Sequence, residues 1–117
     1  MGQNGPVTPR LKCDWCGVYL DDESAIRLLW PDRSLGAAFC RLEHVVPWIM
    51  TKNDWHIWEG VETPEEAAPS CAQSGIDLEE GAIYLVRERD GIRIADGFAG
   101  PEELLAWAKA GGRYRKP

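Results

Sequence analysis

The stretch Cys-Asp-Trp-Cys-Gly at residues 13–17 decides the fold, together with Phe-Cys-Arg-Leu-Glu-His at residues 39–44. A C-x-x-C pair places two thiolates on one tight turn, and the glycine after it lets the backbone leave that turn. A C-x-x-x-H pair adds a third thiolate and an imidazole, which completes a four-ligand set for tetrahedral Zn²⁺. The predicted zinc ligands are therefore Cys13, Cys16, Cys40 and His44.

A β-hairpin is expected between the two ligand pairs. Residues 26–30 and 37–39 are largely apolar, and they flank Pro-Asp-Arg-Ser-Leu-Gly at residues 31–36. This composition is typical of two short strands around a turn. The hairpin would end at the third ligand.

A helix is expected to open near Cys40, so that Cys40 and His44 share one face, one turn apart. Val45 and Trp48 would lie on its inner face. Pro47 removes a backbone donor and clashes with the preceding turn. We expect the helix to kink at Pro47; the alternative is that it begins late enough for Pro47 to lie in its first turn.

This order of knuckle, hairpin and helix resembles a treble-clef zinc finger, and most closely the TRASH and YHS-type group and the zinc fingers of certain ribosomal proteins. The pattern of that group runs C-x-x-C-G, a hairpin, then F-C-x-x-x-C. The chain matches it over residues 11–52, with His44 in place of the fourth cysteine. The resemblance implies a metal-site architecture, and members of the group are associated with metal handling, ribosome binding and protein interaction. The imidazole is compatible with zinc and weakens the case for soft-metal trafficking.

The composition limits the classes of protein to which the chain can belong. The chain has 117 residues, 44% of them hydrophobic, and six tryptophans, which is ample apolar material for a core. No run of about 18 apolar residues occurs, so no membrane span is expected. Residues 1–10 are rich in Gly, Pro and Gln without an apolar stretch, which favours a disordered leader over a signal peptide. Together with the metal-ligand spacing of the cysteines, this predicts a reducing, cytoplasmic location.

The net charge of −6 lies in the second half of the chain. Residues 1–52 carry six basic and six acidic side chains, whereas residues 53–117 carry seven basic and thirteen acidic ones. Nonspecific affinity for nucleic acid comes mainly from basic charge that meets phosphate. The charge distribution therefore argues against a nucleic-acid partner.

Residues 53–81 are predicted to be an acidic connector. They hold eight Asp or Glu and no Lys or Arg, and they are interrupted by Pro64, Pro69 and Gly75. Thr-Pro-Glu-Glu at residues 63–66 favours a helix start, which Pro69 limits to about one turn. No internal repeat is evident along the chain.

A ββα unit is predicted beyond the connector. Residues 82–86 and 92–95 flank Asp90-Gly91, a strong hairpin signal. Residues 100–110 read as one helix that opens with proline and acids and ends at a glycine. The predicted fold is thus α+β: a leader at 1–10, a treble-clef zinc module at 11–52, the connector at 53–81, and a ββα unit at 82–117 packed against the zinc module.

Several residues outside the ligand set invite a functional interpretation. Trp55 and Trp58 flank His56; we expect one of them to cover the core, and the alternative is a binding surface. Cys71 is predicted to be a buried apolar residue, with a reactive thiol or a replacement metal ligand as alternatives. A nucleophilic Cys71 needs a nearby histidine, and apart from His44 only His56 is available.

We expect a non-enzymatic zinc-binding protein, because four protein ligands leave no open position for a catalytic water. Its function would be that of a protein interaction or regulatory module, with a protein partner recognised through exposed tryptophan and acidic surface. Two alternatives stay open. One is a nucleic-acid or ribosome-associated zinc finger, and the other is a thiol-based metal or redox sensor, or small enzyme, that uses Cys71.

Overall fold

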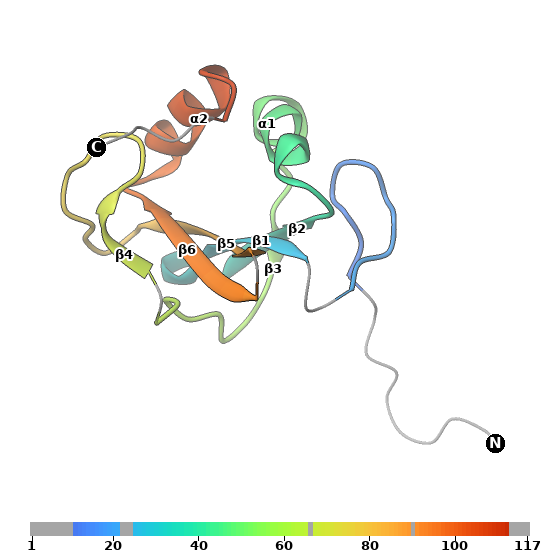
Figure 1. The fold of residues 1–117 in the computed structure, drawn as a ribbon, viewed down its shortest axis with the longest axis horizontal. Coiled ribbons are helices and arrows are strands. Elements are labelled where there is room, and N and C mark those ends of the chain that lie inside the picture. The colour runs from blue at the N-terminus through green and yellow to red at the C-terminus, as the bar shows by residue number, and fades with distance from the viewer. Residues whose placement is uncertain (1–10, 22–24, 66, 90, 113–117) are drawn as a thin grey trace.

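The computed structural model describes residues 11–21, 25–65, 67–89 and 91–112; the leader predicted at 1–10 lies outside them. The described residues form one six-stranded sheet in the order β3-β2-β1-β5-β6-β4 (Figure 1). Neighbouring strands are antiparallel except for the parallel pair β4 and β6. The strands are β1 Ile26–Trp30, β2 Leu35–Phe39, β3 His56–Ile57, β4 Ala67–Cys71, β5 Ile83–Arg89 and β6 Ile92–Phe98.

Both predicted hairpins are confirmed. Strands β1 and β2 are joined through a 3-10 turn at Pro31–Arg33. Strands β5 and β6 pair up to Arg89 and Ile92, and Gly91 has the positive φ of 79° that such a two-residue turn requires. The two hairpins join edge to edge, because β1 pairs with β5 through Leu28 and Leu85. The mixed α+β class is therefore confirmed, and both hairpins belong to one sheet.

The helical stretch after β2 differs from its prediction. It winds as a 3-10 turn over Leu42–His44, as the α-helix α1 over Val45–Pro47 and as a π-helical turn over Trp48–Lys52. Cys40 lies before this stretch, so the prediction that it shares a helical face with His44 is wrong. The α-helical part begins only at Val45, which places Pro47 in its first turn, as in the alternative prediction. Cys40 still meets His44, because β2 delivers it to the start of the helix.

The final helix, α2 at Pro101–Lys109, is confirmed. Pro101 begins it, acidic side chains lie in its first turn and Lys109 lies in its last, as the helix dipole favours. Helices α1 and α2 lie next to each other on one face of the sheet (Figure 1). In the described part of the chain, no helix has both the length and the apolarity that crossing a membrane requires.

The segment predicted as an acidic connector contributes two strands to the sheet. Strand β3 pairs with β2, and β4 pairs with β6. The helix predicted at residues 63–66 is wrong for its described part: Thr63 and Pro64 are non-helical, and Ala67 closes a turn by donating its N–H to the Pro64 carbonyl at 3.1 Å. Backbone pairing to a sheet edge needs no apolar pattern, so composition did not reveal these strands.

The core lies between the sheet and the helices. Its largest fully buried side chains come from both halves of the chain and include Trp48, Trp107, Phe39 and Phe98. Phe39 contacts Trp48 edge-on, with ring centroids 5.2 Å apart. Both halves therefore share a single aromatic core.

Candidate metal centre

Three sulfurs and one imidazole nitrogen lie close together at one point of the fold. They come from the C-x-x-C-G turn at residues 13–17, here called the knuckle, from the end of β2 and from the start of the helical stretch. Ligand atoms of Cys13, Cys16, Cys40 and His44 all lie within 4.8 Å of one another. Cys13 is buried, Cys16 is exposed, and the other two are half-buried. None of the cysteines is in a disulfide. The sequence-predicted ligands are thus brought together, and this cluster can hold a metal ion.

The spacing of the ligand atoms tests whether they fit a tetrahedral ion. Zn–S bonds of about 2.3 Å and Zn–N bonds of about 2.0–2.1 Å give tetrahedral edges of roughly 3.8 Å for S···S and 3.5 Å for S···N. The Cys16 and Cys40 sulfurs are 3.7 Å apart. His44 Nδ1 is 3.5 Å from the Cys13 sulfur and 3.3 Å from the Cys40 sulfur. These three edges match those of a zinc tetrahedron, with Nδ1 as the histidine ligand atom, and the other three ligand-atom pairs lie within 4.8 Å.

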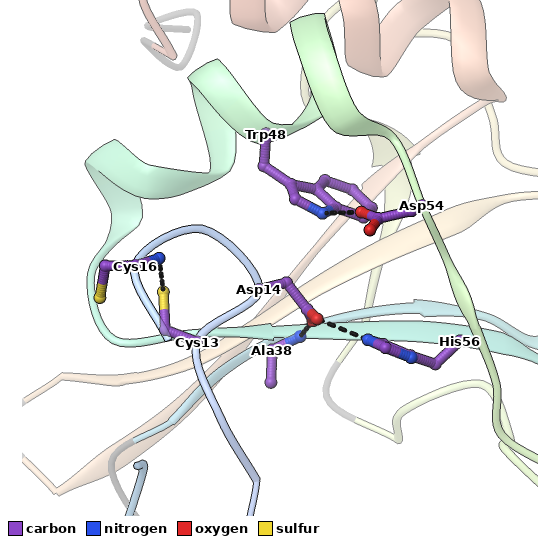
Figure 2. Close-up of polar contacts among 7 residues, drawn as sticks. All are labelled: Cys13, Asp14, Cys16, Ala38, Trp48, Asp54 and His56. Atoms are coloured by element: carbon purple, nitrogen blue, oxygen red, sulfur yellow. Dashed lines mark hydrogen bonds and ion pairs between the residues drawn. The ribbon is translucent and has the colours of Figure 1, made fainter. Parts of the chain in front are cut away.

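The knuckle turn prepares Cys13 as a thiolate. Cys16 N–H points at the Cys13 sulfur at 3.5 Å (Figure 2). Gly17 N–H donates to the Cys13 carbonyl at 2.9 Å. Gly17 has a φ of 82°, which a side chain would strain. The loop is therefore closed by its own backbone, with its donors directed at the sulfur.

Two cysteines of the cluster have opposite pKa shifts. Burial opposes ionisation of Cys13, but backbone amides of Cys16, Cys40 and Trp15 and the His44 ring outweigh it and lower its pKa to about 6. For Cys40, burial and the neighbouring thiols of Cys16 and Cys13 raise the pKa to about 11. Without a cation, the protein thus favours the thiolate form of Cys13 and disfavours that of Cys40 beside it. A bound cation removes that conflict, because it stabilises all coordinating thiolates.

Asp14 fastens the knuckle to the sheet. Its N–H donates to the Ala38 carbonyl at 2.8 Å, and its Oδ2 accepts the Ala38 N–H at 2.8 Å. Its Oδ1 accepts from the His56 ring Nε2 at 2.5 Å (Figure 2). β3 pairs with β2 only at Leu35 and Gly36, so Asp14 occupies the β2 edge where β3 no longer pairs. The sequence did not predict that Asp14 bridges the knuckle to Ala38 and His56. Its only local signal was the position of an acidic residue between the two ligands Cys13 and Cys16.

A pocket of about 710 Å³ opens beside the knuckle. The knuckle side contributes Lys12, Asp14 and Trp15, and the opposite side contributes His56 and Trp58. The Lys52 ammonium lies 5.3 Å from the Trp15 ring centre, within cation–π range. The metal cluster therefore borders a surface that carries two tryptophans, two lysines and one acidic side chain.

The remaining sequence candidates lie elsewhere. Trp55 packs edge-on against Trp30 and Trp48, with ring centroids 5.4 and 5.3 Å apart. The prediction that Trp55 or Trp58 covers the core is therefore confirmed. Cys71 is buried, at 3% exposure, as predicted. Its strand β4 and the strand of His56, β3, are the two edges of the sheet. At the usual strand spacing they are roughly 24 Å apart, so Cys71 and His56 cannot form a catalytic pair.

Comparison of the chain with protein-family models, with curated proteins and with solved structures found no match. The treble-clef assignment stays a resemblance carried by the residues of the chain.

Proposed function

We propose that the protein is a non-enzymatic zinc-binding protein whose zinc is structural, and that it serves as a protein interaction or regulatory module. The observation that carries the zinc assignment is the donor set itself. Three cysteine sulfurs and one imidazole nitrogen form a cluster in which three of the interatomic distances match the edges of a zinc tetrahedron. Hard cations such as Mg²⁺ and Ca²⁺ take oxygen ligands instead.

A structural role follows from which segments the ligands belong to. Cys13 and Cys16 come from the knuckle, Cys40 follows β2, and His44 closes the 3-10 turn before α1. Zinc would tie these three segments together, and a site formed only on folding contributes its binding free energy to folding. All four corners are filled by protein, so this site supplies no position for an activated water.

Two alternatives have less support. A nucleic-acid finger needs a basic surface, whereas the chain has a net charge of −6. A thiol enzyme built on Cys71 needs a base, and His56 is at the other edge of the sheet. We therefore retain a protein partner, recognised at the knuckle beside the metal centre, where Val18 and Tyr19 are about half exposed. Aromatic side chains are enriched at protein interfaces.

The zinc assignment is tested by metal content and X-ray absorption of the protein purified without added chelator. We expect one zinc per chain, with three sulfur scatterers at about 2.3 Å and one nitrogen at about 2.0–2.1 Å. Cys40→Ser should lose the metal, whereas Cys71→Ser should keep it. Equal metal content in the two variants, or a shell of oxygen ligands, would contradict the proposal.

The interaction role is tested by affinity capture from a native lysate with two baits. A Val18→Ser/Tyr19→Ser bait changes only exposed side chains and should stay folded. A partner that binds the unmodified bait and is lost from the variant supports this face as the interface. Identical capture by both baits would place the interface elsewhere.

A further inference from the structure

The turn at Cys71 has the same structure as the metal knuckle at Cys13. Ser74 N–H points at the Cys71 sulfur at 3.4 Å, as Cys16 N–H points at the Cys13 sulfur at 3.5 Å. Gly75 donates to the Cys71 carbonyl at 2.8 Å with a φ of 79°, which matches the bond and conformation of Gly17. The turn at Cys71 therefore repeats the knuckle bond for bond.

The agreement extends to both flanks of the turn. Cys13 N–H donates to Val18 at 2.8 Å, and Cys71 N–H donates to Ile76 at 2.7 Å. The isolated bridge between Lys12 and Tyr19 has its counterpart between Ser70 and Asp77. Each turn is also fixed to the second strand of the hairpin that follows it: Asp14 N–H donates to Ala38 at 2.8 Å, and Ala72 N–H donates to Gly97 at 2.7 Å.

The segments after the two turns also correspond. Each hairpin ends in a buried phenylalanine, Phe39 or Phe98, that packs on a buried tryptophan of the next helical stretch at centroid distances of 5.2 and 5.4 Å. Both helical stretches begin three residues after that phenylalanine. Both end in a left-handed residue, Asn53 or Gly112, whose N–H donates to the carbonyl of that tryptophan at 2.8 or 2.9 Å.

A pseudo-twofold axis relates the two halves. Leu28 pairs with Ala37, and Leu85 pairs with Asp96; each partner lies two residues before the phenylalanine that ends its hairpin. Leu28 and Leu85 then pair with each other where β1 meets β5. Equivalent residues that face one another in an antiparallel pair define a local twofold axis. The helices of both halves accordingly lie on the same face of the sheet (Figure 1).

We propose that residues 69–112 are a second copy of the metal-binding unit at residues 11–53, in which a zinc site has lost its ligands. Within this copy, the four ligand positions of the first unit are occupied by Cys71, Ser74, Ala99 and Glu103. Their burial follows the same order: buried, exposed, half-buried and half-buried, as for Cys13, Cys16, Cys40 and His44. The absence of an internal repeat, as read from the sequence, is corrected by this correspondence.

Cys71 retains the donors of a metal-binding thiolate without a metal set around it. Ala99 N–H points at its sulfur at 3.3 Å, from the position at which Cys40 acts on Cys13 in the first copy. Ala99 has no ligand atom, and a serine hydroxyl is a poor substitute for a thiolate toward zinc. The second copy thus has the backbone of the site, the thiol of Cys71 and a carboxylate at Glu103, and it lacks the thiolates of the second and third ligand positions.

This proposal rests on the proposed function, because it assumes that the first copy binds zinc. Restoring the lost ligands in the second copy tests the duplication separately from that assumption. We expect the full-length variant Ser74→Cys/Ala99→Cys/Glu103→His to contain one zinc per chain more than the unmodified protein, measured by mass spectrometry of metals after removal of excess zinc. The readout is the difference between the two proteins. An unmodified protein without zinc would sink the proposed function while leaving this difference measurable.

The matched control adds Cys71→Ser to the triple variant and should abolish the additional zinc. A second variant, Ser74→Cys/Ala99→Cys, leaves Glu103 as the fourth ligand and should bind one additional Co²⁺ with thiolate charge-transfer absorption. No additional metal in folded variants would overturn the proposal. So would variants that remain unfolded in the presence of zinc, because the proposal requires these positions to accept ligands. Additional metal that persists after Cys71→Ser would also contradict it.

Discussion

Removing the Asp14 carboxylate should destabilise the knuckle by an amount that the structure allows us to work out. In Asp14→Ala the Ala38 N–H loses its acceptor, and Ala38 is only 1% exposed. A buried amide without a partner costs about 1–3 kcal/mol. The His56 side chain is 54% exposed, so losing its contact adds less than about 1 kcal/mol. We expect the free energy of unfolding to fall by about 1–4 kcal/mol.

Two further variants separate these contributions in urea titrations of the zinc-loaded protein. Asp14→Asn keeps a carbonyl oxygen for the Ala38 N–H and should lose about 1 kcal/mol or less, and His56→Ala should lose a similar amount. Asp32→Asn serves as a control on an exposed acid. Competition with a chelating dye should also show a zinc affinity about 10–100-fold lower in Asp14→Ala. The reasoning is refuted if His56→Ala costs as much as Asp14→Ala, or if Asp14→Ala matches the Asp32 control.

Three other outcomes are expected. Chelation, or Cys40→Ser, should lower the melting temperature by more than about 10 °C, because a structural zinc contributes more free energy than the margin of a typical domain; an unchanged melt would rule out a structural metal. Gly36→Ala should cost about 1–3 kcal/mol, since an added Cβ would lie 2.0 Å from the Trp58 ring, and most of that cost should vanish in a Trp58→Ala background measured by urea titration. Cys71 should resist iodoacetamide in the native protein although hydrogen bonds from Ser74 outweigh burial and lower its pKa; rapid labelling seen by peptide mass spectrometry would show that the turn opens.

The sequence was most informative where chemistry demands particular residues at particular spacings. The four predicted ligands do meet, since C-x-x-C and C-x-x-x-H leave few arrangements for a tight cluster. Both hairpins and α2 were predictable because alternating strands, Asp90-Gly91 and a proline-first helix are local signals. Their joining into one sheet was not, because the pairing of β1 with β5 depends on residues more than fifty positions apart.

Other features were hidden for physical reasons. Strand β3 consists of two exposed residues, and β4 contains Pro69, so neither has the apolar alternation that marks a strand. The hydrogen bond between Asp14 and His56 joins residues 42 positions apart that belong to no common motif, so the sequence did not predict it. The duplicated unit escaped notice because the ligands that would have identified it are the positions that changed, while Phe98 and Trp107 remained. The packing of Phe98 against Trp107 is thus retained in the second copy, although the metal ligands are not.

The two helical stretches explain how one copy can dispense with a metal that the other would need. Residues 42–52 contain four β-branched residues, Val45, Val46, Ile49 and Thr51, together with Pro47. These are poor helix formers, and the stretch winds irregularly. A metal bond to His44 at the start of this stretch would supply the order that its backbone propensity does not. In the second copy the positions that correspond to these residues hold only leucine and alanine, and Pro101 begins the helix. That helix forms on its own propensity and its buried tryptophan, so loss of ligands there removes a bond that the fold no longer requires.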